Sequence, residues 1–133
     1  MTKKFEDILL IAKQNVEHNP SIVEADTNLA VRRYIAGLID EVREVEKEIK
    51  VDNEVYLNDE LSDIAWDYAT LLSVLENRGL ISSAQDIFEY AHKKYLERTP
   101  AFLEGSQDLW IEIKEQQKKE LKKKHEEKYG KNC

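Results

Sequence analysis

The sequence has few of the residues that make turns and crosslinks. Its 133 residues include four glycines, two prolines and a single cysteine, which is the last residue, Cys133. One cysteine cannot form a disulfide within the chain, and we expect it to be inert. This cysteine usage fits a reducing compartment, and we therefore expect a cytoplasmic protein.

Long apolar runs are missing as well. No run approaches the length that would span a bilayer, and acidic residues interrupt the N-terminal segment before any signal-peptide pattern develops. The formal net charge of −7 argues against general binding to nucleic acid. We expect neither a membrane nor a nucleic acid among the partners.

The residues that are present predict an all-α fold. Charged residues make up 35% of the chain, and apolar residues recur at alternating spacings of three and four. We expect an antiparallel bundle of about five helices, whose four-helix core is completed by oligomerisation. We also expect a domain over residues 1–105 and a charged helical extension over 106–133. The predicted helices span about 3–17, 28–50, 58–78 and 82–97, with a fifth beginning near Trp110 and breaks expected at Pro20 and Thr99-Pro100.

One segment accounts for the acidity of the chain. Residues 40–67 hold eleven acidic and three basic side chains, a local net charge of −8. Glu41, Glu44 and Glu48 are spaced i, i+3, i+7, and Glu60, Asp63 and Asp67 repeat that spacing. On a helix, each trio lies along one stripe.

The apolar seams predict where these stripes lie. Both acidic trios flank an apolar seam at equivalent heptad positions, and the short link over residues 51–56 favours antiparallel neighbours. Antiparallel helices bring equivalent flanks side by side, so the two acidic stripes should converge. Converging carboxylates repel unless something positive lies among them. The pattern therefore predicts a site for hard divalent cations, which prefer oxygen ligands.

These helices resemble the MazG-like nucleoside triphosphate pyrophosphohydrolases. Asp40-Glu41-Val42-Arg43-Glu44 is similar to the acidic ExxE element of that family, and Glu60-Leu61-Ser62-Asp63 is similar to its ExxD partner. The run Lys94-Tyr95-Leu96-Glu97-Arg98-Thr99-Pro100 resembles the basic helix end that follows in many members. The resemblance implies an all-α fold, Mg²⁺ with Mn²⁺ as an alternative, and hydrolysis of a (deoxy)nucleoside triphosphate to monophosphate and pyrophosphate. It also implies a homodimer or homotetramer.

The expected roles follow from this chemistry. Metal-bound water would attack the α-phosphorus while the cations neutralise phosphate charge. We assign Glu41, Glu44, Glu60 and Asp63 as metal ligands and catalytic residues, one of which can act as general base. Asp67 is a further candidate ligand. Lys94 and Arg98, one turn apart, are the candidates for binding phosphate groups.

Other interpretations stay open at this point. An acidic run on a helix is most often a solvated face, which here could belong to a non-enzymatic helical adaptor that docks a basic partner. Lys94 and Arg98 could simply complement the dipole at a helix C-terminus. The activity could also be that of another pyrophosphohydrolase branch, such as a dUTPase or the phosphoribosyl-ATP type.

Overall fold

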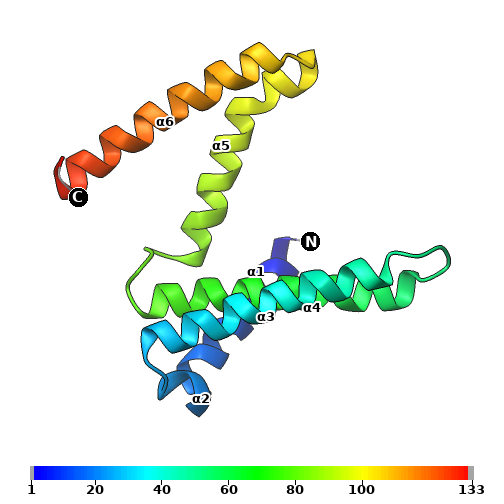
Figure 1. The fold of residues 1–133 in the computed structure, drawn as a ribbon. Helices are drawn as coiled ribbons and strands as arrows, with labels where there is room; N and C mark the ends of the chain where they lie inside the picture. The colour runs from blue at the N-terminus through cyan, green and yellow to red at the C-terminus, as the bar shows by residue number, and fades with distance from the viewer. Residues whose placement is uncertain (1, 132–133) are drawn as a thin grey trace. The chain divides into compact units, whose positions relative to one another are not determined.

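The computed structural model describes residues 2–131, most of which are helical (Figure 1). Cys133 lies outside this range, as does any test of its role. No strand occurs between residues 2 and 131, and the predicted all-α class is confirmed. The described residues form six helices: α1 (Thr2–His18), α2 (Pro20–Val23), α3 (Thr27–Glu48), α4 (Glu54–Asn77), α5 (Ala84–Glu104) and α6 (Gln107–Tyr129).

The helices group into two compact units. The first is Met1–Ala84, with helices α1 to α4, and the second is Gln85–Cys133, which contains α6 and nearly all of α5. The domain division at residue 105 that the sequence suggested stays a prediction.

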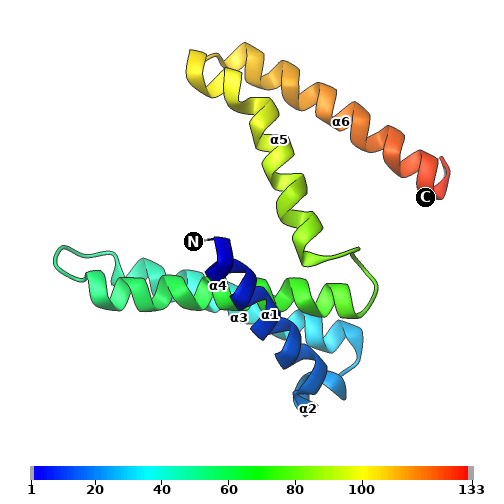
Figure 2. The ribbon, with the colours of Figure 1, turned by 180° about the vertical axis from the view of Figure 1, so that it is seen from behind.

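The core of the first unit lies where α1 and α3 pack on α4. Val16, Ile22, Ala25, Ala30 and Val74 form its buried cluster. Figure 2 shows α1 crossing α4, and the α4 segment from Ala69 to Val74 is buried. Small side chains dominate this contact, so the helix backbones can approach closely while Val16 and Val74 fill the centre.

The α3–α4 hairpin is closed by Asn53. Its side-chain amide donates hydrogen bonds to the Glu48 backbone carbonyl (2.8 Å) and to Glu48 Oε2 (2.7 Å). The first of these bonds satisfies a backbone carbonyl at the end of α3. Helix α4 begins directly after Asn53, whose carbonyl accepts from the Leu57 amide (3.1 Å). The helix predicted to begin near residue 58 therefore begins earlier, at Glu54, and Asn58 lies inside α4.

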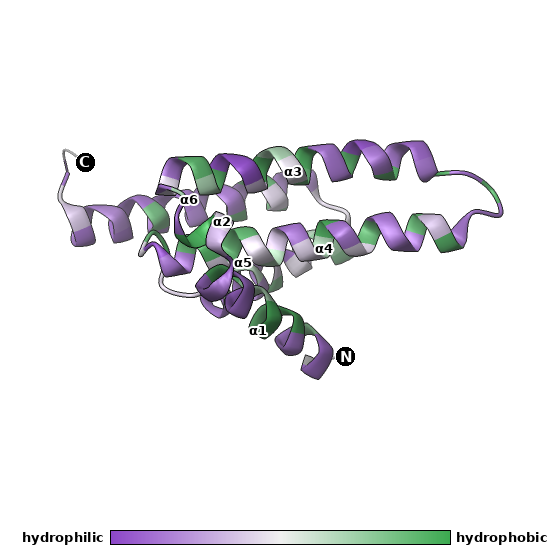
Figure 3. Ribbon diagram, turned by 90° about the horizontal axis from the view of Figure 1, so that it is seen from below, coloured by the Kyte–Doolittle hydropathy of each residue, from purple (hydrophilic) through white to green (hydrophobic). Residues whose placement is uncertain are grey.

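The half of the hairpin nearer its loop keeps much apolar surface exposed. Figure 3 shows hydrophobic and hydrophilic residues alternating along both helices. The exposed apolar side chains near the loop and along the two helices include Ile35, Ile39, Val42, Ile49, Val51, Val55 and Leu61. The predicted seam is therefore covered only in part within this chain: Leu38 and Val45 are half-buried on α3, whereas Ile35, Val42 and Ile49 are exposed.

Two helix ends follow the chemistry of glycine. Gly79 has φ 75° and follows α4, with the Leu80 amide donating to the Leu75 carbonyl (2.9 Å). Gly105 has φ 61° and ends α5 in the same way, with the Ser106 amide donating to the Ala101 carbonyl (3.1 Å). Both are Schellman-type ends, in which only glycine adopts the left-handed conformation without strain.

The prediction that Thr99-Pro100 ends the fourth long helix is wrong. Pro100 lies inside α5, which continues to Glu104. A proline in a helix loses one backbone hydrogen bond and costs about 3 kcal/mol. The residues after it offset part of this cost, because Ala101 is 4% exposed and the Phe102 ring lies 5.0 Å from the Trp110 ring.

The second unit is a pair of helices joined by a short turn. Ser106 caps α6, with its hydroxyl oxygen accepting from the Leu109 amide (3.1 Å). Contact between the helices relies on long side chains at Arg98, Trp110 and Gln117. Beyond Gln117, α6 is mostly charged and exposed.

The hairpin loop predicts a difference between two asparagines of α3–α4. Replacing Asn53 with Ala removes two hydrogen bonds to Glu48 and should destabilise the chain by about 1–2 kcal/mol. Asn58→Ala is the matched control, because Asn58 is exposed within α4 and Ala favours helix. Urea unfolding followed by circular dichroism measures both. Equal stability of the two variants would contradict the role given to Asn53.

Candidate metal centre

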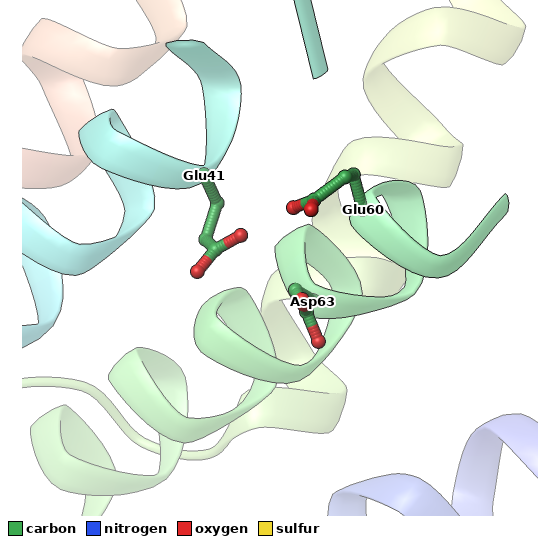
Figure 4. A group of neighbouring side chains, drawn as sticks. All are labelled: Glu41, Glu60 and Asp63. Carbon is green, nitrogen blue, oxygen red and sulfur yellow. The ribbon is translucent and has the colours of Figure 1, made fainter. Parts of the chain in front are cut away.

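Three carboxylates from the two hairpin helices meet at one point. Glu41 projects from α3, and Glu60 and Asp63 project from successive turns of α4 (Figure 4). One oxygen from each lies within 4.8 Å of the others, and all three residues are half-buried. Hard divalent cations are held by groups of carboxylate oxygens such as this one.

The geometry follows from the antiparallel packing of the hairpin. Because α3 and α4 run in opposite directions, the flank that carries Glu41 faces the flank that carries Glu60 and Asp63. The spacing of three between Glu60 and Asp63 puts both side chains on the same side of α4. The structure therefore brings together three of the residues selected from the sequence.

Asp67 lies one turn beyond Asp63 and packs over Gly37. A Cβ atom added at Gly37 would lie 3.4 Å from Asp67 Oδ2. The glycine thus leaves room for a carboxylate side chain of the neighbouring helix. Tyr34, which the sequence analysis did not single out, lies near enough for the charge of Asp67 to act on it. Burial raises the pKa of Tyr34, its hydrogen bond with Asn15 lowers it, and the charge of Asp67 raises it further.

The carboxylates disturb one another's protonation. Partial burial raises the pKa of Glu41, and a hydrogen bond with Glu60 together with the charges of Asp63, Glu60 and Asp67 raises it further. Partial burial also raises the pKa of Asp67, and the charge of Asp63 adds to this. Both shifts mean that the ionised cluster is unfavourable without a positive partner, either a proton or a metal ion.

Glu44 lies outside the trio. Its Oε1 is 3.2 Å from Lys47 Nζ, in an exposed ion pair one turn along α3. Glu48, the third member of the predicted α3 stripe, accepts a hydrogen bond from Asn53 and helps close the loop. Of the predicted α3 stripe, only Glu41 therefore reaches the carboxylates of α4, while Glu48 holds the loop.

Lys94 and Arg98 belong to the second unit. The Arg98 side chain is buried, and its Nε donates to Gln117 Oε1 (2.8 Å). Its guanidinium carbon lies 4.7 Å from the centre of the Trp110 ring and 5.1 Å from that of Tyr95. Lys94 is half-buried, and its carbonyl accepts from Gln117 Nε2 (3.0 Å). Gln117 was not singled out from the sequence, where it stands in a run of polar residues.

Comparison with known protein families identifies this arrangement. The model of the MazG nucleotide pyrophosphohydrolase domain matches residues 30–103, which contain α3 except its first turn, all of α4 and nearly all of α5. The chain belongs to the MazG nucleotide pyrophosphohydrolase family. The resemblance seen in the sequence is thereby confirmed. No curated protein and no solved structure gives a match.

Membership in the MazG family gives the acidic trio a chemical context. The activity of the family is nucleotide pyrophosphohydrolysis, which in general depends on a divalent metal ion. The three converging oxygens suit such an ion, because they are hard ligands on two helices that hold them in place.

None of the helices within residues 2–131 combines the length and the apolar composition that a membrane span requires.

The raised pKa of Glu41 predicts how the metal-free protein responds to loss of one charge. Glu41→Gln keeps the shape of the side chain and removes its repulsion from Glu60 and Asp63. We expect the variant to melt a few degrees above the parent at neutral pH in the presence of a chelator. The folded pKa of Glu41 exceeds its ordinary value of 4.5, so the parent loses stability as the pH rises through that interval. The advantage of the variant should fade as the pH falls toward that value.

Glu44→Gln provides the matched control for this measurement. Glu44 is a glutamate of the same helix that pairs with Lys47 and lies outside the trio. Its neutralisation should leave the melting temperature unchanged or slightly lower, because an exposed ion pair contributes little. Equal shifts for Glu41→Gln and Glu44→Gln at neutral pH would refute a local repulsion at the trio.

Proposed function

We propose that this chain hydrolyses nucleoside triphosphates, including deoxynucleoside triphosphates, to monophosphate and pyrophosphate with Mg²⁺. The observation that carries the proposal is the convergence of Glu41, Glu60 and Asp63 in a member of the MazG family. Family membership favours an enzyme over an adaptor, whose acidic face would need no such convergence. Mn²⁺ has the same preference for carboxylate and water ligands and can replace Mg²⁺.

The carboxylates would share the work at the metal. Glu41, Glu60 and Asp63 hold the cation from both sides of the hairpin, and Asp67 extends the negative charge one turn along α4. Glu44 joins them only if its side chain leaves Lys47. When bound, Mg²⁺ neutralises phosphate charge and lowers the pKa of a coordinated water. One of the carboxylates accepts the proton of the attacking water.

Lys94 and Arg98 are the proposed phosphate ligands. Arginine offers a planar fork of donors that matches two phosphate oxygens, and lysine offers a point charge. The two residues are four positions apart on α5, about one turn, so both charges lie on one side of the helix.

We propose that the chain works as a homodimer or homotetramer. The apolar seam of the α3–α4 hairpin is exposed at Ile39 (47%), Val42 (52%) and Leu61 (46%), close in sequence to the carboxylate trio. A patch that repeats along two helices marks an association surface more often than scattered apolar residues do. A second copy is the simplest partner for a seam of this kind, because a symmetric interface uses the same patch twice.

The position of bond cleavage tests the proposed reaction. Incubation with a panel of nucleoside triphosphates and Mg²⁺ in ¹⁸O-labelled water should give labelled monophosphate and unlabelled pyrophosphate, since water attacks the α-phosphorus. Glu60→Gln should lose at least about 100-fold in kcat, and a chelator should abolish turnover. Label in pyrophosphate, or release of diphosphate and orthophosphate as first products, would exclude this reaction. A preference for dUTP in the same panel would point to the dUTPase branch.

The oligomer is tested separately. Leu61→Lys places a charge on the exposed seam and should shift the chain toward the monomer in sedimentation velocity at micromolar concentration. Leu103→Lys is the control, because Leu103 is 82% exposed but lies on α5 outside the hairpin. A parent chain that sediments as a monomer, or an equal shift for both variants, would remove the hairpin as the interface.

A further inference from the structure

Arg98 is a buried cation without a counter-ion in its own unit. The residue is 7% exposed, yet among residues 2–131 no carboxylate lies within ion-pair distance of it. Burying an unpaired charge is costly, so a charged group that stays buried is normally paired or serves a ligand. Two aromatic rings, Tyr95 and Trp110, compensate in part through contacts with the guanidinium.

The guanidinium is fixed at one nitrogen and open at the other two. Nε donates to Gln117 Oε1 at 2.8 Å. In the described part of the chain, Nη1 and Nη2 have no protein acceptor. Neither of these two atoms is fully buried. Both outer nitrogens therefore retain access to their surroundings. A guanidinium held in this way presents its outer edge to an oxyanion.

Gln117 itself is held by two further bonds. Its Nε2 donates to the Lys94 carbonyl (3.0 Å) and to Glu97 Oε2 (3.0 Å). The Lys94 carbonyl and the Glu97 carboxylate can only accept hydrogen bonds, so the amide nitrogen of Gln117 must point toward them. The amide oxygen then points toward Arg98, which can only donate. The Gln117 residue is 8% exposed, and its amide oxygen and amide nitrogen both form hydrogen bonds with residues of α5. Three hydrogen bonds to one amide fix its geometry more firmly than a single contact does.

We infer that Gln117 is a positioning residue that orients Arg98 for binding phosphate oxygens. The inference rests on the proposed role of Arg98 as a phosphate ligand. Gln117 lies on α6, beyond the match to the MazG family at residues 30–103. This helix thus acquires a function: it supplies Gln117 and Trp110, which set the plane of the guanidinium and leave Nη1 and Nη2 directed at the ligand. Gln117 does not touch the substrate.

A double-mutant cycle on Arg98 and Gln117 tests this role, with inorganic pyrophosphate as the probe. Affinity is measured by calorimetry on the full chain in the presence of Mg²⁺. Gln117→Leu should weaken pyrophosphate binding by about 10- to 100-fold, because a misplaced binding group costs this much. Gln116→Leu, at the exposed neighbouring glutamine, should leave it unchanged. Arg98→Met, which keeps the stem over Trp110, should weaken it as much as Gln117→Leu or more.

The double variant separates positioning from support of the fold. With Met at 98, the Gln117→Leu change should have no further effect on pyrophosphate affinity, because Gln117 acts only through Arg98. The double variant should nevertheless melt above both single variants, since neither Arg98 Nε nor Gln117 Oε1 is then left without its partner. In hydrolysis, Gln117→Leu should divide its effect between KM and kcat as Arg98→Met does.

Each outcome decides one of the two ideas. If folded Arg98→Met binds pyrophosphate like the parent, the phosphate role of Arg98 falls and the positioning role falls with it. If Arg98→Met loses affinity but Gln117→Leu does not, only the positioning role is overturned. An equal loss from Gln117→Leu in both backgrounds also overturns it. Should Gln117→Leu fail to fold, Gln117→Asn takes its place, because it keeps the amide but withdraws it by one methylene, about 1.5 Å.

Discussion

Repulsion between carboxylates is the constraint on which the α3–α4 hairpin is built. If the two helices were free to move, the carboxylates of Glu41, Glu60 and Asp63 would separate. Each ionised carboxylate has a lower free energy in open solvent, away from the other negative charges. The hairpin is fastened on either side of them. The buried segment Ala69–Val74 holds α4 on the core of the first unit, and the Asn53–Glu48 bonds close the loop at the other end. The trio lies between, held in a geometry that a divalent cation makes favourable.

The second unit solves the opposite electrostatic problem. Here a single cation, Arg98, is withdrawn from water by aromatic rings and one amide. The first unit gathers negative charge, for which we propose a divalent cation, and the second encloses a positive charge, for which we propose a phosphate group. Metal–phosphate chemistry uses both kinds of site, which is consistent with membership in the MazG nucleotide pyrophosphohydrolase family.

The sequence was most informative where periodicity and chain direction decide the outcome. Two acidic stripes on neighbouring antiparallel helices must face each other, and Glu41, Glu60 and Asp63 do. It was less informative where two local signals compete. Asn53 and Asn58 both stand near the start of α4, and only the packing of the loop, where the Asn53 side chain bonds to Glu48, makes Asn53 the residue at which the helix begins. Pro100 signals a helix end, but contacts made by the following residues carry α5 past it.

Contacts between distant residues could not be read from the sequence at all. Gln117 stands among lysines, glutamates and another glutamine, and nothing in that run marks it as buried. Its role depends on the meeting of α5 and α6 near Arg98 and Trp110. Similarly, the glycine at position 37 gains meaning only because Asp67 lies over it.

The pairing of α5 with α6 also bears on how such a chain can be inherited. The match to the family model ends at residue 103, inside α5, while the hydrogen bond of Arg98 Nε reaches Gln117, fourteen residues further on. A recombination event at that boundary would deliver an arginine that keeps Tyr95 but lacks Trp110 and Gln117. The recipient would inherit a charged group with only part of its enclosure. The residues that enclose this charge therefore extend beyond the segment that the family model matches.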